Sequence, residues 1–340
     1  MNYEERLIAL INDQMPSSPL RRSRSGEVDS ELILLGGQEY LFSMDDFSHE
    51  DLLPEKDPFL LGWNLACAAL SDLIAAGGNP LVYAHSMVIP QTWDEAYIKS
   101  FTQGISAVLQ EYSVSFSGGD LGVSENWRYT ASVLGKPLGR LINRKGCQAG
   151  DSILLTGKIG AGNLAALSCL FTGREELNGL VKAEDIRFPI HSRLAQIIAK
   201  LASCAIDTSD GVFAALHTIS QLNETGFQIK NLPWHPQAAL AAKALNLPEL
   251  PLFLGECGEY EILFCIPRQQ RDALLACLRE AAVVASELGV ITANPRQRIL
   301  YWENHHIDLT DYSLRARDFG RVQDYLKAML DWVYDRVTAR

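Results

Sequence analysis

The chain has 340 residues, which is too long for one ordinary domain and comfortable for two. Hydrophobic residues make up 47% and charged residues 21%, a globular balance with enough apolar material for a buried core. The net charge of −11 excludes neither nucleotide nor metal binding, but it argues against nucleic acid or an anionic membrane as partner, because both attract clustered Lys and Arg.

Cysteine usage and the start of the chain predict a cytoplasmic protein. The seven cysteines form no CxxC pair, and most lie in apolar stretches, which suits reduced thiols packed in a core. The first 14 residues are acidic and helix-like, so we expect no signal peptide. No run reaches the roughly 18 apolar residues that a membrane span needs.

Hydrophobic periodicity predicts alternating strands and helices in the first half of the chain. A short amphipathic helix at 1–14 precedes a polar, Pro/Ser/Arg-rich segment at 15–27 that we expect to be mobile. The elements predicted next are strands at 31–35 and 39–43, a helix at 59–76 stopped by Gly77-Gly78-Asn79-Pro80, a strand at 81–89, a helix at 94–112, and strands at 114–117 and 129–134.

Proline and glycine in residues 136–150 mark a predicted domain boundary, after which the pattern restarts. The elements predicted beyond it are strands at 153–156, 262–266 and 299–302, and helices at 163–171, 191–201, 212–223, 269–282 and 321–337. The alternation predicts an α/β or α+β class, with domains at 1–140 and 141–320 and a C-terminal helix at 321–340.

Aspartates at the ends of apolar strands or helices are the most informative residues. They are Asp45 and Asp46 in LFSMDDF, Asp72 in LSDLIAAGG, Asp120 in FSGGDLG, and Asp207 and Asp210 in AIDTSDG. A carboxylate at such a place costs free energy unless it is paired or bound to a cation. Any one of them could be a helix cap or a turn residue. Together they could hold Mg²⁺, which prefers oxygen ligands and shares them with phosphates.

Two glycine segments could bring backbone N–H groups to a phosphate. Gly118 and Gly119 precede Asp120, where a Cβ would keep a phosphate away. Residues 157–162, GKIGAG, lie between a predicted strand and a predicted helix, so helix N-terminal amides could face an anion there, although glycines also make ordinary tight turns. Neither a Walker A loop nor a Rossmann spacing is present.

These segments resemble those of the thiamine-monophosphate kinases. That family's superfamily includes aminoimidazole ribonucleotide (AIR) synthetase, selenophosphate synthetase and the hydrogenase maturation factor that dehydrates a carbamoyl group. The resemblance runs from about Asp29 to about Phe264 and rests on LFSMDDF, LGWNLACAALSDLIAAGGNPL, EYSVSFSGGD, VLGKPLGRLINRKGCQAGDSILLTGKIG, AIDTSDGVFAAL and GEYEILF. It implies a two-domain AIR synthase-like fold, whose N-terminal α/β domain pairs with its twin in a homodimer with a barrel-like core. The second domain would be a sheet covered by helices.

The resemblance also implies roles for individual residues. The residues implied to hold Mg²⁺ around the phosphates of ATP are Asp29, Asp45, Asp72, Asp120, Asp207 and Asp210. Asp45, Asp72, Asp120 and Asp210 are implied to be catalytic, and Gly119, Asp120, Arg144 and Ser209 to contact ATP. Asp29 is all that this chain keeps of the family's Gly-Asp-Asp-Ala segment. Arg144 also suits phosphate oxygens by its own chemistry, with a solvated arginine as the alternative.

Two positions that contact the substrate in these kinases differ here. The kinases' Val-Glu-Gly-Val-His-Phe stretch places its histidine where this chain has Leu52. Their Gly-Gly-Glu-Asp-Tyr-Glu motif places a glutamate where this chain has Gly258. A shifted local alignment would let His49 or Glu259 take these places. The ATP positions therefore match better than the thiamine positions.

Three functions remain open at this point. The first is a Mg²⁺- and ATP-dependent kinase that transfers the γ-phosphate to a small phosphorylated metabolite, with thiamine phosphate as the default acceptor; such catalysis rests on positioning and electrostatics. The second is ATP-dependent activation of a carbonyl or amide oxygen, in an AIR synthase-like enzyme. The third is a catalytically silent nucleotide-binding regulator, which ATP turnover would distinguish from the other two.

Overall fold

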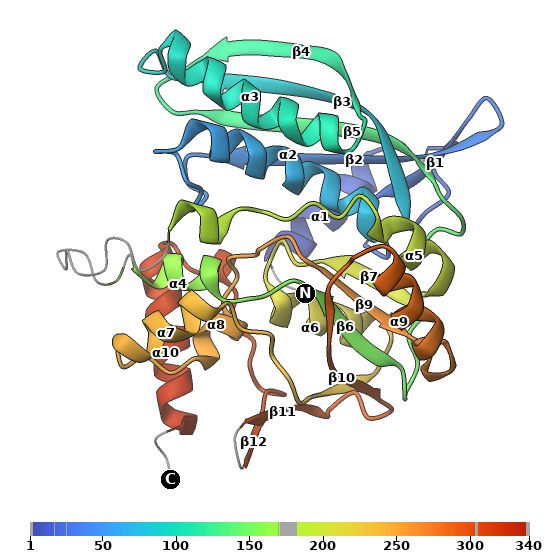
Figure 1. The fold of residues 1–340 in the computed structure, drawn as a ribbon, viewed down its shortest axis with the longest axis vertical. Coiled ribbons are helices and arrows are strands. Elements are labelled where there is room, and N and C mark those ends of the chain that lie inside the picture. The colour runs from blue at the N-terminus through green and yellow to red at the C-terminus, as the bar shows by residue number, and fades with distance from the viewer. Residues whose placement is uncertain are drawn as a thin grey trace.

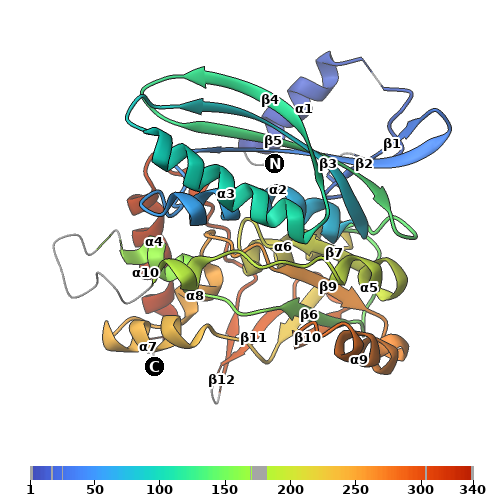
Figure 2. The same ribbon diagram turned by 45° about the horizontal axis from the view of Figure 1, so that its top comes forward.

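Two β-sheets, with helices packed between and around them, form the structure (Figure 1). The computed structural model describes residues 3–16, 18–24, 26–168, 170, 182–302 and 305–337. In both ribbon views the helices α2 (Pro58–Ala75) and α3 (Glu95–Glu111) lie between the first sheet and the second half of the chain (Figure 2). This layering confirms the predicted α/β class.

The first sheet is built from residues that precede the glycine-rich boundary. In the order in which they pair, its strands are β1 (Glu31–Leu35), β2 (Gln38–Ser48), β5 (Arg128–Pro137), β3 (Gly78–Ile89) and β4 (Ser115–Val123). Neighbouring strands are antiparallel except β3 and β4, which run parallel. Helix α1 (Tyr3–Gln14) precedes the sheet. Strand β4 is left at one edge, with its outer backbone groups unpaired within the described chain.

Helix α2 is the central helix of the molecule. Its start is fixed by Asp57, whose side chain accepts a hydrogen bond from the Leu60 N–H, and by Pro58 at the first helical position. Two glycines bring it close to α3. A Cβ at Gly62 would lie 2.0 Å from the Phe101 carbonyl oxygen, and one at Gly104 would lie 2.0 Å from that of Phe59. The two helix backbones therefore pack in direct contact.

The second sheet is built from the rest of the chain. In pairing order its strands are β12 (His305–Asp308), β11 (Arg298–Trp302), β8 (Gly226–Ile229), β10 (Ala285–Thr292), β6 (Ser152–Thr156), β9 (Ile262–Ile266) and β7 (Cys204–Asp207). The helices around it are α4 (Ala161–Ser168), α5 (Leu194–Leu201), α6 (Val212–Leu222), α7 (Pro236–Ala244), α8 (Leu250–Leu254), α9 (Arg271–Glu280) and α10 (Val322–Val337). Every residue of β6 and β9 is buried, as their unbroken apolar sequences require.

One hydrophobic core joins the two halves of the chain. Leu73 and Ile74 of α2 belong to the same buried cluster as Ile198 of α5 and Phe264 of β9. A second core lies within the later half and includes Phe213 and Met329. Helix α2 thus packs against the first sheet on one side and against β7 and α5 on the other. The seam between the halves is where the functional residues meet.

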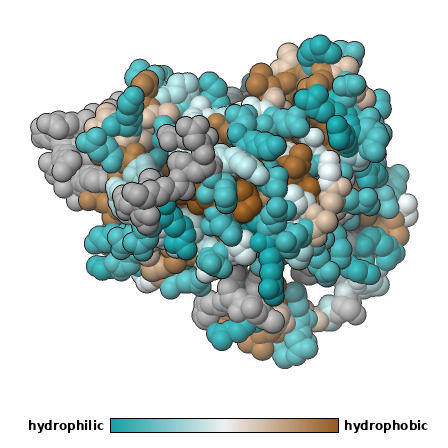
Figure 3. All heavy atoms as spheres, turned by 90° about the horizontal axis from the view of Figure 1, so that it is seen from below, coloured by the Kyte–Doolittle hydropathy of each residue, from teal (hydrophilic) through white to brown (hydrophobic). Residues whose placement is uncertain are grey.

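Helix α2 is also the one described helix that is long and apolar enough to cross a bilayer. In the structure 78% of this stretch is buried, so its apolar character is explained by its place in the core. Viewed from below, the outer surface shows hydrophobic residues in small groups among hydrophilic ones (Figure 3).

The segment at 15–27, predicted to be mobile, is partly ordered against β1, and this corrects the prediction. The Arg22 N–H donates to the Leu32 carbonyl (2.7 Å), and the Leu34 N–H donates to the Leu20 carbonyl (2.8 Å). Arg21 also forms an ion pair with Glu31. The free edge of β1 and the opposite charge explain the order. Residues 17 and 25, and the predicted end of the helix at 171, lie outside the described residues.

Candidate active site

Three aspartates from distant parts of the chain meet at the seam between the halves. Carboxylate oxygens of Asp29, Asp72 and Asp207 all lie within 4.8 Å of one another. Asp29 precedes β1, Asp72 lies in the last turn of α2, and Asp207 ends β7. Asp45 on β2 adds a fourth carboxylate, whose charge raises the pKa of Asp72. The structure therefore assembles four of the six predicted metal ligands.

Serine hydroxyls hold these carboxylates in place; Ser43 and Ser71 were not among the predicted site residues, whereas Ser209 was predicted as an ATP contact. Ser43 donates to Asp72 Oδ2 (2.5 Å), and Ser71 donates to Asp207 Oδ2 (2.6 Å). Ser209 donates to Asp207 Oδ1 (2.9 Å). Ser43 could have been inferred, because it lies two residues before Asp45 and side chains two apart share one face of a strand.

The same alternation separates the two neighbouring aspartates of β2. Asp46 points to the other face, where it is exposed and accepts hydrogen bonds from Arg128 Nε (2.9 Å) and Thr130 Oγ1 (2.6 Å). Asp45 points towards the acidic cluster. Among the residues that the structure describes, Arg128 compensates the charge of Asp46 and no basic side chain pairs with Asp45, so Asp45 is the one that needs a cation.

Burial makes the charged form of the cluster costly. Desolvation raises the pKa of Asp29 to about 7, against the opposing effect of Arg144, and raises that of Asp45 to about 7. The pKa of Asp72 rises well above its ordinary range through burial and then through the charges of Asp45 and Asp207. Burial also raises the pKa of Asp207, although the Ser71 and Ser209 hydroxyls oppose this. Several mutually repelling buried carboxylates are stable when ionised only with a cation between them.

Arg144 is the cationic group that the structure places beside this cluster. Its guanidinium donates from Nε to Asp29 Oδ1 (2.8 Å), and the Asp29 side chain is only 1% exposed. The alternative of a solvated arginine is therefore wrong. One arginine cannot neutralise four carboxylates, and oxygen donors at this spacing are the kind of site that Mg²⁺ takes. The donor set fits the predicted metal.

Asp120 and Gly119 do not join the cluster within one chain. Both lie on the edge strand β4, where they are exposed and pair with Ser86 and His85 of β3. Their predicted contact with Mg²⁺-ATP stays a prediction.

Asp210 is held by arginines that the sequence analysis missed. Arg315 Nη2 lies 3.1 Å from Asp210 Oδ2, and Arg317 Nη2 lies 3.5 Å from Asp210 Oδ1. Arg315 also pairs with Glu256. Both arginines come from the segment between β12 and α10, beyond the matched motifs, so no motif pointed to them. In this structure the carboxylate of Asp210 is therefore paired with two arginine side chains and does not belong to the acidic cluster.

The amides of the glycine turn at 157–162 already have a hydrogen-bond acceptor within the protein. Glu259 Oε1 accepts hydrogen bonds from the Gly160 N–H (2.8 Å) and the Gly162 N–H (3.1 Å), and its side chain is buried. The prediction that these amides face a ligand anion is therefore corrected. Glu259 is committed to this turn, so it does not take the substrate-contacting place of the kinases' glutamate. Burial raises its pKa to about 8.

A cavity beside the acidic cluster contains both positions at which the chain departs from the kinases. It is lined by Phe47, Leu52, Phe188, Ser209, Gly258 and Tyr260, among others. His49 is exposed and is not among the lining residues. A side chain at 258 would collide with the backbone, because its Cβ would lie 2.0 Å from the Thr208 carbonyl oxygen. Gly258 is therefore required by the local backbone and cannot be exchanged for glutamate without moving it.

Comparison with known proteins shows the family of the chain. Residues 28–136 match the AIR synthase related protein, N-terminal domain, and residues 148–301 match the AIR synthase related protein, C-terminal domain. The chain belongs to the AIR synthase related family. The family resemblance predicted from the motifs is confirmed.

Curated members of this family that resemble the chain over most of its length are thiamine-monophosphate kinases. The one from Escherichia coli O157:H7 is 28% identical over 299 residues, covering 85% of this chain and 90% of the relative. The one from Methanopyrus kandleri is 27% identical over 274 residues, covering 78% and 84%.

Solved structures of other proteins share the fold of this chain. AaThiL complexed with AMPPCP and TMP superposes with a TM-score of 0.72 at 20% identity, covering 88% of this chain and 94% of that one. Escherichia coli HypE, a hydrogenase maturation protein, superposes with a TM-score of 0.64 at 18% identity, covering 89% and 95%. At these identities the likeness concerns the fold, and it confirms the predicted two-domain architecture.

Proposed function

We propose that the chain is a Mg²⁺- and ATP-dependent kinase that phosphorylates a small phosphorylated metabolite, with thiamine monophosphate as the first acceptor to test. The observation that carries the proposal is the meeting of Asp29, Asp72 and Asp207 at the seam of a fold whose curated relatives are thiamine-monophosphate kinases. Asp45 supplies the fourth carboxylate.

The residues of the chain would act chiefly by positioning. Asp29, Asp45, Asp72 and Asp207 would hold Mg²⁺, which when bound neutralises charge on the phosphates of ATP. The serine hydroxyls keep Asp72 and Asp207 oriented before any ligand arrives, so less reorganisation is needed on binding. Arg144, at the rim of the same cluster, is placed to bind a phosphate oxygen if its pairing with Asp29 yields to metal.

The cavity lined by Leu52 and Gly258 is the proposed acceptor site. Phe188 and Tyr260 pack there with ring centroids 4.4 Å apart and ring planes tilted by 37°, and Ser209 links the cavity to the acidic cluster. An aromatic wall of this kind suits a flat ring on the acceptor. The kinases' histidine and glutamate contacts are absent from it, so the chain would recognise its acceptor more through shape and stacking than through these polar groups.

The direct test is Mg²⁺-dependent ADP release from ATP, measured with and without thiamine monophosphate. We expect release that requires both Mg²⁺ and the acceptor, together with thiamine diphosphate formed in equal amount. If ADP appears with inorganic phosphate and without a new diphosphate, the chain would instead activate another group in the AIR synthase-like manner. If ATP binds but no ADP forms with any phosphorylated acceptor, the kinase proposal fails and a nucleotide-binding regulator remains.

A homodimer built on the edge of β4 would complete the proposed enzyme. Leu121 and Val123 on this strand are 61% and 63% exposed, and an uncovered apolar edge strand invites pairing with another strand. Asp120 and Gly119 lie on the same strand, so pairing would place them in the interface.

We therefore expect Leu121→Lys to convert a dimer into a monomer, as measured by light scattering after gel filtration. Leu240→Lys is the matched control, because Leu240 on α7 is equally exposed (62%) and lies outside β4, so this variant should stay dimeric. A monomeric wild type at micromolar concentration would refute the dimer.

A further inference from the structure

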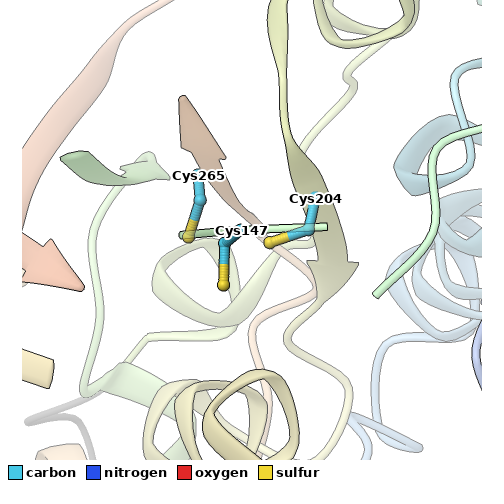
Figure 4. Close-up of side chains that lie close together, drawn as sticks. All are labelled: Cys147, Cys204 and Cys265. Carbon is cyan, nitrogen blue, oxygen red and sulfur yellow. The ribbon is translucent and has the colours of Figure 1, made fainter. Parts of the chain in front are cut away.

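Three buried cysteines that the proposed kinase does not use lie together in the second half of the molecule (Figure 4). The sulfur atoms of Cys147, Cys204 and Cys265 are all within 4.8 Å of one another, and Figure 4 shows them forming a triangle. Cys204 and Cys265 are fully buried, and Cys147 is 6% exposed. They come from three separate segments of the sequence, so no local motif predicts that they lie together.

The backbone brings the three segments together by specific pairings. Cys204 of β7 is the direct partner of Cys265 of β9 in the antiparallel pair, so both side chains lie on one face of the sheet. The segment leading to Cys147 is tied alongside β7 by a hydrogen bond from the Ala205 N–H to the Asn143 carbonyl (3.1 Å). Gly146 permits the approach, because a Cβ there would lie 2.4 Å from the Ser203 carbonyl oxygen.

The three thiols are hydrogen-bonded to one another. Hydrogen bonds from Cys204 and then from Cys265 lower the pKa of the Cys147 thiol to about 4. The hydrogen bond to Cys147 raises the pKa of Cys204 and of Cys265 well above the ordinary range. The three sulfur atoms therefore already surround a common centre, within 4.8 Å of one another.

A neutral oxygen donor lies beside the thiols. The Thr225 hydroxyl is next to Cys147, and Thr225 is 7% exposed. It is hydrogen-bonded to the Cys147 thiol, which helps to lower the pKa of that thiol. The hydroxyl oxygen is therefore held at the edge of the sulfur cluster, within reach of an ion bound there.

We propose that Cys147, Cys204 and Cys265 form a binding site for one thiophilic divalent ion of the zinc and cadmium class. Thiolates are the preferred ligands of such ions, and three sulfurs at this mutual spacing can surround a single ion with Zn–S bonds of about 2.3 Å. The Thr225 hydroxyl, or a water in its place, would complete a tetrahedral set. Binding releases the remaining thiol protons to solvent.

The arrangement favours a metal over a disulfide. A disulfide would join two of the three sulfurs and leave the third as a buried free thiol, whereas a metal uses all three. A divalent ion also leaves less uncompensated negative charge among buried thiolates than a monovalent one would. This site is separate from the acidic cluster, which offers oxygen ligands and suits Mg²⁺.

The test is titration of the full chain, reduced and free of metal, with Cd²⁺ in the presence of excess Mg²⁺. We expect one equivalent of Cd²⁺ to produce a thiolate-to-metal charge-transfer band in the ultraviolet, with release of protons. Excess Zn²⁺, which occupies the same thiolates without an absorption band in this range, should raise the Cd²⁺ concentration needed to produce the band. Cys147→Ser, Cys204→Ser or Cys265→Ser should each weaken Cd²⁺ binding on the order of 100-fold or more, whereas Cys277→Ser, outside the cluster, should leave it unchanged.

A second measurement needs no variant, so it stays decisive if a serine variant fails to fold. In the wild type, Zn²⁺ should protect Cys147 from alkylation by N-ethylmaleimide, as read by peptide mass spectrometry. The absence of a charge-transfer band, or a band without protection of Cys147, overturns the proposal. So does mild oxidation that yields a Cys204–Cys265 disulfide in a chain that binds no Cd²⁺, since the cluster would then be a redox pair.

Discussion

Replacing Asp72 by asparagine should lower Mg²⁺-dependent ADP release by a factor on the order of 1000 while leaving the fold intact. Asp72 lies at the centre of the acidic cluster, and its carboxylate oxygen meets those of Asp29 and Asp207 within 4.8 Å. Asparagine keeps the shape and can still accept a hydrogen bond from Ser43, but it removes the negative charge that holds a metal. Steady-state rates with saturating ATP and acceptor measure the loss.

Asp46→Asn is the matched control for this substitution. Asp46 is also an aspartate of the matched motifs, but it lies on the exposed face of β2 with Arg128 and Thr130. We expect its activity to stay within a few-fold of the wild type. Thermal melts separate function from folding, because Mg²⁺ with ATP should raise the melting temperature of the control and not that of Asp72→Asn. Full activity in Asp72→Asn would remove the acidic cluster from the mechanism.

Free of metal, the protein should lose stability as the pH rises from about 4 to above 7. Desolvation raises the folded pKa of Asp29 and of Asp45 to about 7, above the 3.8 of the unfolded chain. Between these values the folded state holds protons that the unfolded state has released, so the free energy of unfolding falls as pH increases. Saturating Mg²⁺ binds the ionised carboxylates and should offset this loss. Urea unfolding at pH 5 and pH 8, with Mg²⁺ and with chelator, measures it.

Two variants make this pH dependence specific. Asp72→Asn removes a buried carboxyl whose own folded pKa lies well above its ordinary range, so the metal-free profile should flatten. Asp46→Asn should retain the wild-type slope, because its carboxylate lies outside the cluster. A metal-free wild type as stable at pH 8 as at pH 5 would contradict the buried, uncompensated cluster.

Part of the acidic cluster could be anticipated from local patterns, because Asp72 and Asp207 end apolar elements, whereas Asp29 was implied by the family resemblance alone. The sequence placed Asp72 at the end of a long apolar helix and Asp207 after an apolar run, and these positions meet. The alternation of β2 explains why Asp45, and not its neighbour, joins them. Strand β7 itself was not predicted, since four buried residues carry too little periodicity to be distinguished from a loop or a helix.

Other parts of the site depend on contacts between distant segments. Arg315 reaches Asp210 from a segment 105 residues further along the chain, and no local pattern connects them. The cysteine cluster draws on a loop and two strands in the same way. Glu259 was weighed as a substrate contact from its motif, but its partners are amides of the glycine turn, which only the folded chain brings to it.

The position of helix α2 limits how this protein can be cut into fragments and how it can change in evolution. It is covered on one side by the first sheet and on the other by β7 and α5, which belong to the later family region. A fragment ending near the glycine-rich boundary would leave one side of this apolar helix in water. The two halves should therefore melt in one cooperative transition, and a lineage could exchange loops around the site far more readily than it could shed either half.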